Sequence, residues 1–224
     1  MSTSIPVEIS LGSGIYTIPD ASLILRLPLT KLRRWVVGTP DQETKIIDSW
    51  GEGKERAFDF NELIEAYSIY SLRSLGISLQ KIKSAHRALS KIFDCRYPFA
   101  KRGILTDGSH ILFDESELGK SSLVNLTDRL QYEFRGLVLG FCDKVDFSEA
   151  TDLASAFWPM GKDRSIVVDP KRAFGRPVMT GTNTTTEAVY ALFRGGEAVE
   201  DLSDQYDQDP SVIKDAIDFH KLVA

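Results

Sequence analysis

The sequence is poor in the residues that build metal sites and disulfides. It holds two cysteines, Cys95 and Cys142, and three histidines, His86, His110 and His220. None of the five stands at a spacing typical of metal ligands, and a reducing compartment keeps isolated thiols unpaired. We therefore expect no metal, no cofactor and no structural disulfide.

Long apolar runs are also missing. The longest candidate, Leu137 to Cys142, is far shorter than the roughly 20 residues that span a bilayer. The first residues, Met-Ser-Thr-Ser-Ile-Pro, lack the basic and apolar regions of a secretory signal. We expect a cytoplasmic protein without a membrane partner, with one or two domains in its 224 residues.

No set of catalytic residues stands out. The sequence has no phosphate-binding loop, no pair of carboxylates with a partner base and no activated nucleophile, so we expect a protein that is not an enzyme. Its net charge is −5, which means that nucleic-acid binding would need a local basic patch.

One such patch lies near the start of the chain. Thr17 is expected to cap a short helix, and Pro28 to follow a turn at residues 26–28. A second helix is predicted from about Leu29 to Val37, with Leu32, Trp35 and Val36 recurring at helical spacing on its buried side. Two helices around a tight turn form a helix-turn-helix, whose second helix is slim enough to enter a major groove.

The exposed side of this second helix, with the turn before it, is basic. Four cations and no acid lie between Arg26 and Arg34. We take as candidate DNA-binding residues Arg26, Thr30, Lys31, Arg33 and Arg34, since Lys and Arg reach phosphates and guanine edges. A solvated basic face on a small helical hairpin explains the same spacing about equally well.

A β-hairpin is predicted next, where a wing would lie. Its arms are Lys45 to Trp50 and Arg56 to Phe58, around a turn with two glycines. Lys45 and Arg56 are candidate phosphate contacts. A surface hairpin that contacts no DNA is the alternative.

These residues resemble the winged helix-turn-helix of the MerR family. The resemblance lies in the ordered residues Tyr16, Thr17, Ile18, Ala21, Leu32, Arg33 and Trp35. The run from Leu72 to Ile82 is similar to the helix–Gly–helix link of that family. The resemblance implies a DNA-binding domain over residues 1–95. The long dimerisation helix of MerR proteins is not evident, because Cys95-Arg-Tyr-Pro98 ends the last helix early.

Residues 96–164 are predicted to form a connecting region. A hairpin is expected around Asp107-Gly108 and a helix from Thr127 to about Phe141. Before it, the pattern predicts helices over about 59–75 and 78–93. After it, Ala154 to Trp158 is expected to pair with Ser165 to Val168.

The last quarter of the chain predicts a strand, a loop and three short helices. Ile166 to Val168 should end at Pro170, and helices are expected over about 187–194, 198–206 and 210–223. From residue 187 onward there are nine acidic and three basic residues, a local net charge of −6. Such a module should repel phosphates and suits a basic partner, although a soluble acidic surface without a partner explains it too.

This module resembles the domain-of-unknown-function 433 family. The ordered series is Val-Asp-Pro at 168–170, Phe-Gly-Arg-Pro-Val at 174–178, Gly-Thr, Gly-Glu-Ala-Val-Glu-Asp-Leu at 196–202, and Tyr206. The resemblance implies an antitoxin of the VapB type, the partner of a PIN-like ribonuclease toxin. The partner-binding residues it suggests are Arg176, Glu197, Glu200, Asp201, Asp204 and Tyr206.

Together, these patterns predict an α+β, mostly helical fold with divisions at residues 1–95, 96–164 and 165–224. We expect the antitoxin of a type II toxin–antitoxin pair that neutralises its toxin and binds operator DNA as a homodimer, for autorepression. The alternative is a stand-alone MerR-like transcriptional regulator, which would need a ligand pocket or a cysteine sensor.

Overall fold

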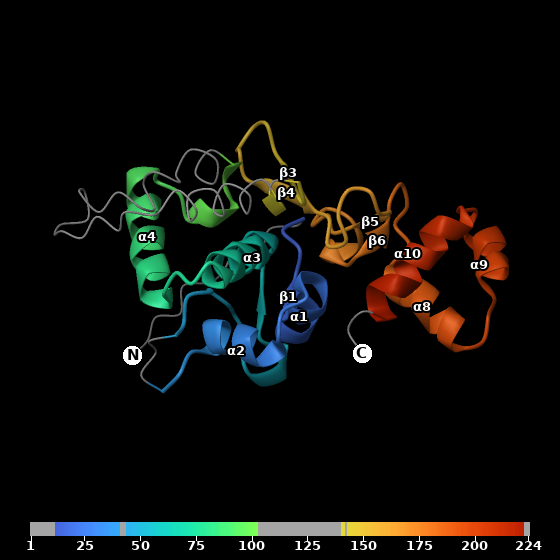
Figure 1. Ribbon diagram of the computed structural model, residues 1–224, viewed down its shortest axis with the longest axis horizontal. Coiled ribbons are helices and arrows are strands. Elements are labelled where there is room, and N and C mark those ends of the chain that lie inside the picture. Colours follow the sequence, from blue (N-terminus) through green and yellow to red (C-terminus); the bar gives the residue numbers. More distant parts are fainter. Residues whose placement is uncertain (1–11, 41–43, 103–139, 142, 222–224) are drawn as a thin grey trace.

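The computed structural model describes residues 12–40, 44–102, 140–141 and 143–221 (Figure 1). Helices dominate this part of the chain, and the strands are short and antiparallel, which confirms the α+β, mostly helical class. The hairpin predicted around Asp107 and nearly all of the helix predicted from Thr127 lie outside the described residues. His110 and Cys142 lie outside them too.

The first elements follow their sequence signals closely. Strand β1 (Tyr16–Thr17) leads into α1 (Ile18–Leu25), and α2 spans Leu29–Val37 as predicted. Thr17 forms a capping box with Asp20: the Thr17 hydroxyl accepts the Asp20 N–H at 3.3 Å, and the Asp20 carboxylate accepts the Thr17 N–H at 3.2 Å. The capping box therefore fixes the start of α1.

The predicted wing is present only in part. A short 3-10 turn η1 (Gly53–Glu55) precedes β2 (Ala57–Phe58). Trp50 and Ala57 exchange backbone hydrogen bonds of 2.9 and 3.0 Å, which is a single bridge instead of a hairpin with long arms. Strand β2 pairs along its length with β1, which the sequence did not indicate.

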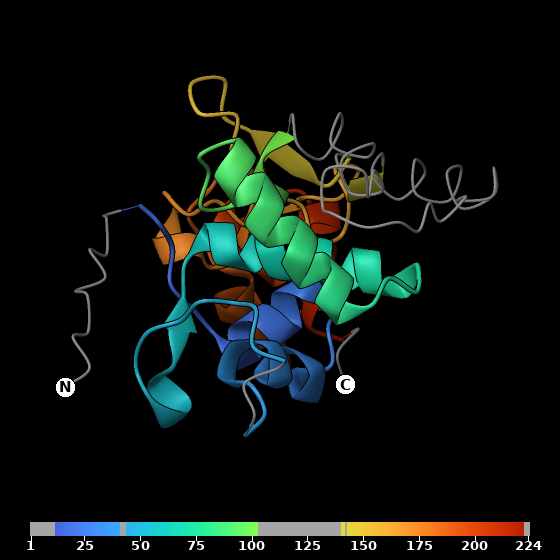
Figure 2. The same ribbon diagram turned by 90° about the vertical axis from the view of Figure 1, so that its left-hand side faces the viewer.

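Two capped helices form the middle of the N-terminal half. Helix α3 (Phe60–Ser74) is capped by Asp59, and α4 (Leu79–Ile92) by Ser78, so both helices lie close to their predicted ranges. The 3-10 turn η2 (Pro98–Ala100) packs on α3 and α4. Figure 2 shows α4 in front of α3, so that α3 lies inside the bundle.

Two small strand pairs connect the N-terminal helices to the last three helices. Strands β3 (Val145–Phe147) and β4 (Ala154–Phe157) pair with each other, as do β5 (Ile166–Val167) and β6 (Val178–Met179). Phe157 and Val168 link these pairs by backbone hydrogen bonds of 2.9 and 2.8 Å. The pairing predicted between 154–158 and 165–168 exists only as this bridge. A 3-10 turn η3 (Ala173–Gly175) lies between β5 and β6.

The last three helices match the predicted ones. They are α8 (Thr186–Arg194), α9 (Val199–Tyr206) and α10 (Pro210–Lys221). Asp215 of α10 ties them to the preceding turn, because it accepts hydrogen bonds from the Arg164 guanidinium at 2.5 Å and from the Ser165 N–H at 2.7 Å. In Figure 1 the three helices lie on the far side of β5 and β6 from α2 and α4.

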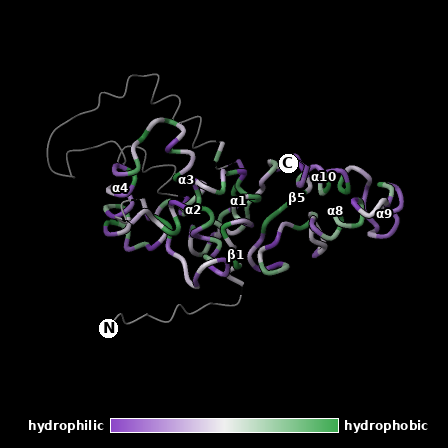
Figure 3. Tube along the Cα trace, turned by 90° about the horizontal axis from the view of Figure 1, so that it is seen from below, coloured by the Kyte–Doolittle hydropathy of each residue, from purple (hydrophilic) through white to green (hydrophobic). Residues whose placement is uncertain are grey.

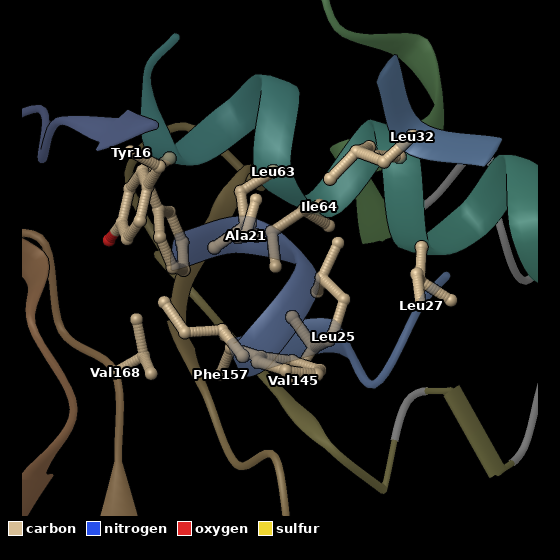
Figure 4. Close-up of a cluster of buried hydrophobic side chains, with 14 of the residues drawn as sticks. Tyr16, Ala21, Leu25, Leu27, Leu32, Leu63, Ile64, Val145, Phe157 and Val168 are labelled. Atoms are coloured by element: carbon tan, nitrogen blue, oxygen red, sulfur yellow. The ribbon is translucent and has the colours of Figure 1, made fainter. Parts of the chain in front are cut away.

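A single hydrophobic cluster extends from β1 to α10. Figure 4 shows Tyr16, Ala21 and Leu63 beside Phe157 and Val168, so the connecting strands share a core with the N-terminal helices. The division at residues 95/96 and 164/165 stays a prediction. Within the described ranges, none of the helices has the length and apolar character that crossing a bilayer requires.

Candidate functional site

Helix α2 presents a basic face to solvent. Its apolar side chains Leu32, Trp35 and Val36 are buried, so the helical period turns the intervening residues outward. Arg33 and Arg34 are exposed, and within the described part of the chain no ion pair engages either guanidinium. Two unengaged cations on one helix make a suitable contact for phosphates.

Lys31 and Thr30 lie on the same helix with different surroundings. Both residues are exposed, but the Lys31 ammonium lies 4.9 Å from the centre of the Tyr70 ring. This cation–π contact draws the Lys31 side chain toward α3. Thr30 lies in the first turn of α2, where a hydroxyl can reach a phosphate.

Arg26 does not lie with the other cations. It ends α1 in the left-handed conformation, with φ of 57°. Its guanidinium is 4.5 Å from the centre of the Phe219 ring and donates a hydrogen bond to the Phe219 carbonyl oxygen. Burial lowers the pKa of Arg26. The structure therefore gives Arg26 a contact with α10, and a role of Arg26 in DNA binding stays a prediction.

The two cations of the partial wing differ in freedom. The Arg56 guanidinium donates to the Ser49 hydroxyl at 3.2 Å, which ties it across the Trp50 bridge. Lys45 is half-buried beside the buried Ile47. Because Arg56 is bound to Ser49 and Lys45 is half-buried, both are weaker candidates for phosphate contact than the exposed Arg33 and Arg34.

Helix α9 presents an acidic face at the other end of the molecule. Leu202 is buried against the module, whereas Glu200, Asp201 and Asp204 are exposed. Glu197 is exposed in the turn before α9, and Tyr206 at its end is half-buried. Acids in the first turn are favoured by the helix dipole, so this charge stabilises the helix as well as marking its surface. Figure 3 shows α9 as largely hydrophilic.

Arg176, the other predicted partner contact, lies apart from α9. It follows η3, and its guanidinium is 3.4 Å from the Glu187 carboxylate, with both side chains mostly exposed. Asp169 caps the turn before η3 by accepting the Lys171 N–H at 2.9 Å, which is a structural role. The structure thus brings four predicted acids together around α9 and leaves Arg176 beside η3.

The turn η3 holds backbone strain. Ala173, Phe174 and Gly175 have φ of 45°, 57° and 84°, the left-handed region. For residues with a side chain this conformation disfavours folding by roughly 1–2 kcal/mol each. A Cβ on Gly175 would overlap the Tyr16 hydroxyl and lie 3.2 Å from the Gly14 Cα. Close packing of β1 on this turn therefore requires glycine at 175.

Sequence reasoning missed a buried acidic cluster under α3. Glu65 is fully buried, and its carboxylate accepts the Phe99 N–H at 2.7 Å and lies 2.9 Å from the His86 Nε2. Burial raises the pKa of Glu65, against the lowering effect of His86 and the backbone N–H groups. Burial also raises the pKa of Glu62 to about 9, helped by repulsion from Glu65. The spacing of Glu62 and Glu65 on the inner side of α3 was the available signal.

Metal binding finds no support in the described ranges. No group of three or more histidine, cysteine, aspartate or glutamate side chains is arranged there to hold an ion. His86 is paired with Glu65, and His220 stacks on Tyr190 with ring centres 4.8 Å apart. Cys95 is a free, half-buried thiol.

The C-terminal module is similar to a known class of domain. Residues 166–220 match the model of DUF433, a family described as a protein of unknown function. This segment is therefore similar to DUF433, as the series from Val168 to Tyr206 predicted.

Two relatives extend the similarity beyond this domain. The chain is 24% identical over 230 residues to a protein of Mycobacterium tuberculosis (strain ATCC 25618 / H37Rv) named "Putative antitoxin VapB45", covering 95% of this chain and 96% of the relative. The crystal structure of Rv2018 from Mycobacterium tuberculosis matches with a TM-score of 0.72 and 25% identity, covering 90% of this chain and 96% of that one. The MerR-like assignment of residues 1–95 stays a prediction.

Proposed function

We propose that the chain is the antitoxin of a type II toxin–antitoxin pair, with a PIN-like ribonuclease as its toxin and its own operator as its DNA target. The similarity to a protein named as an antitoxin extends over 95% of the chain, so it includes the basic helix as well as the DUF433 domain. This full-length similarity supports an antitoxin role for the whole protein.

The observation that carries the proposal is the separation of two oppositely charged surfaces. The exposed cations Arg33 and Arg34 lie on α2, whereas the exposed acids Glu200, Asp201 and Asp204 lie on α9 beyond the connecting strands (Figure 1). A basic helix favours DNA and an acidic helix repels it. One protein can therefore hold an operator and a second macromolecule at the same time.

The DNA half of the proposal rests on α2. Its exposed side carries Thr30, Lys31, Arg33 and Arg34 and no acid, and Lys45 and Arg56 lie in the segment that follows. A helix of this kind reads a half-site in the major groove, and two half-sites require a homodimer. Such a dimer on its own promoter would act as an autorepressor.

The toxin half rests on α9. A ribonuclease binds RNA through a basic groove, and an acidic helix is complementary to such a groove. The carboxylates of Glu197, Glu200, Asp201 and Asp204 would occupy the RNA entry and neutralise the enzyme. Tyr206 at the end of α9 adds an amphipathic ring to this surface.

Co-expression with the adjacent gene tests both halves. We expect the full-length chain to relieve growth arrest caused by a neighbouring nuclease and to co-purify with it, and the complex to shift the promoter fragment in a gel. If the chain neither relieves growth arrest nor co-purifies with the nuclease, the antitoxin function is overturned. A complex that leaves the promoter fragment unshifted would overturn operator binding alone.

A charge-reversed helix sharpens this test. Glu200→Lys with Asp201→Lys should weaken toxin binding by roughly tenfold or more, because two attractive charges become repulsive. The matched control is Glu149→Lys, which reverses an exposed acid on the turn before β4. Equal affinities for the two variants would exclude α9 from the interface.

A further inference from the structure

An exposed aromatic side chain stands outside both surfaces described above. Phe174 is 80% exposed, the largest fraction for a bulky apolar side chain in the described part of the chain. Ile15, 46% exposed, adjoins it, since the Ile15 N–H donates to the Phe174 carbonyl oxygen at 3.3 Å. We call Ile15, Lys171, Phe174 and Arg176 the Phe174 patch. An apolar centre with a polar rim is typical of an interaction site.

The backbone is built to point Phe174 into solvent. Ala173, Phe174 and Gly175 follow one another in the left-handed region, which residues with side chains avoid. Gly175 packs against the Tyr16 hydroxyl so closely that a Cβ would not fit. The fold thus keeps an unfavourable backbone and leaves an aromatic ring in water, and strain of this kind is concentrated at functional sites.

The loop is held rigid by its own hydrogen bonds. The Arg172 guanidinium donates to the Thr182 carbonyl and to the Asn183 side-chain oxygen, the latter at 3.2 Å. The Arg172 carbonyl accepts the Gly175 N–H at 2.8 Å, and the Asp169 carbonyl accepts the Arg172 N–H at 3.0 Å. A loop fixed in this way loses little conformational freedom on binding, which favours affinity.

The rim of the patch is positive in a chain of net charge −5. Residues 171–176 read Lys-Arg-Ala-Phe-Gly-Arg, with no acid. Lys171 is exposed, and the contact of Arg176 with Glu187 joins two side chains that are 66% and 72% exposed, so it holds Arg176 only weakly. An aromatic ring beside an arginine is the composition of interface residues that dominate binding energy.

We infer that the Phe174 patch docks a protein whose surface offers an apolar pocket rimmed by carboxylates. This inference rests on the proposed function, under which the protein is the nuclease toxin. The toxin would then contact the chain at two places: its basic groove would bind α9, and its acid-rimmed pocket would bind Phe174. Duplex DNA fits the patch poorly, because its base faces are stacked inside. A second copy of the chain, docked symmetrically, would bring Lys171 and Arg176 against the same cations.

The test measures binding of the full-length chain to the nuclease encoded beside it, by calorimetry. Phe174→Ser should weaken binding roughly 30-fold or more, the loss expected of a central aromatic anchor. The matched control is Phe93→Ser, which removes a 39% exposed phenylalanine at the end of α4 and should change binding by less than about twofold. Arg176→Glu should also weaken binding, and added salt should make this loss of affinity smaller because it screens the charges.

Phe174→Gly separates binding from folding. Glycine adopts the left-handed region freely, so this variant should melt no lower than the unmutated chain and still lose affinity. If the nuclease binds the unmutated chain and binds Phe174→Gly with the same affinity, the docking site is overturned and the antitoxin function is left intact. A chain that binds no nuclease would overturn the proposed function first. If Phe174→Gly loses a homodimer, measured by light scattering, and its affinity for the toxin is unchanged, the patch binds a second copy of the chain instead of the toxin.

Discussion

The Arg26 guanidinium lies 4.5 Å from the centre of the Phe219 ring and donates to the carbonyl oxygen of the same residue. Arg26 closes α1 at the turn before the basic helix, and Phe219 belongs to the last turns of α10. A cation near the C-terminal end of a helix is favoured by the helix dipole. The contact therefore joins α1, at the turn before α2, to the last helix of the segment that matches DUF433, and the two proposed binding surfaces share a structural link.

Arg26→Ala is expected to destabilise the protein. It removes a hydrogen bond from a charged donor and a cation–π contact, together about 2 kcal/mol in free energy of unfolding. Chemical denaturation with urea measures it as a lower midpoint. Arg33→Ala, at an exposed position, should change the unfolding free energy by less than about 0.5 kcal/mol. Equal midpoints for the two variants would show that the link to Phe219 contributes nothing.

Arg33→Ala should act on DNA binding instead. Loss of one phosphate contact is expected to weaken operator affinity by roughly tenfold and to reduce the slope of log affinity against log salt by about 1. Titration of a labelled promoter fragment at several salt concentrations measures both. Lys214→Ala, which removes an exposed cation on α10, is the control. An unchanged gel shift for Arg33→Ala would exclude α2 as the recognition helix.

The helices could be predicted because their signals are local. Thr17, Ser78 and Thr185 each accept the N–H group three residues further on, and the apolar period fixes the buried side, so the starts and faces of the helices can be read from neighbouring residues. The strand pairs could not be predicted in this way. Ala57 pairs with both Thr17 and Trp50, and two-residue strands carry too little pattern to select a partner.

The candidate site shows the same division. Arg33 and Arg34 are outward because of the period of their own helix. Arg26 points elsewhere because its left-handed backbone and the distant Phe219 decide its direction, and no local pattern contains that information. The Phe174 patch could not be predicted from the sequence for a similar reason, since its exposure depends on the packing of Gly175 against Tyr16.

Glu62 makes stability depend on pH. Its pKa is about 9 in the folded protein against an ordinary value of 4.5, mainly because it is buried. Between these values the folded state binds a proton that the unfolded state has released, so the free energy of unfolding falls as pH rises, by about 1 kcal/mol per pH unit. Glu62→Gln removes this dependence and should stabilise the protein at pH 8. Urea unfolding from pH 5 to 8 measures it.

The same glutamine keeps the oxygen that accepts the Asp48 N–H, which makes Glu62→Gln a conservative change. Glu52→Gln, at an exposed position in the turn before η1, should leave the pH profile as it is. If Glu62→Gln destabilises the protein at pH 8 and preserves the slope, the carboxyl is not the group that responds to pH.

The packing of Gly175 against Tyr16 gives the last prediction. Gly175→Ala should reduce the free energy of unfolding by about 3 kcal/mol, because the new methyl group overlaps the Tyr16 ring and a left-handed alanine is strained. Gly181 has a similar φ of 79°, with nothing within 4 Å of an added Cβ. Gly181→Ala therefore measures the backbone strain without the overlap, and it should reduce the free energy of unfolding by about 1 kcal/mol.

The Tyr16 hydroxyl distinguishes overlap from strain. It is buried, points away from the other side chains labelled in Figure 4, and has no hydrogen-bond partner among the described residues. Burial, with repulsion from Asp169 and Asp59, holds its pKa well above the ordinary value. Tyr16→Phe alone should therefore be nearly neutral or slightly stabilising. Combined with Gly175→Ala it should recover part of the lost stability, because the overlapping oxygen is gone. Strictly additive effects of Tyr16→Phe and Gly175→Ala in urea unfolding would contradict the close contact between β1 and η3.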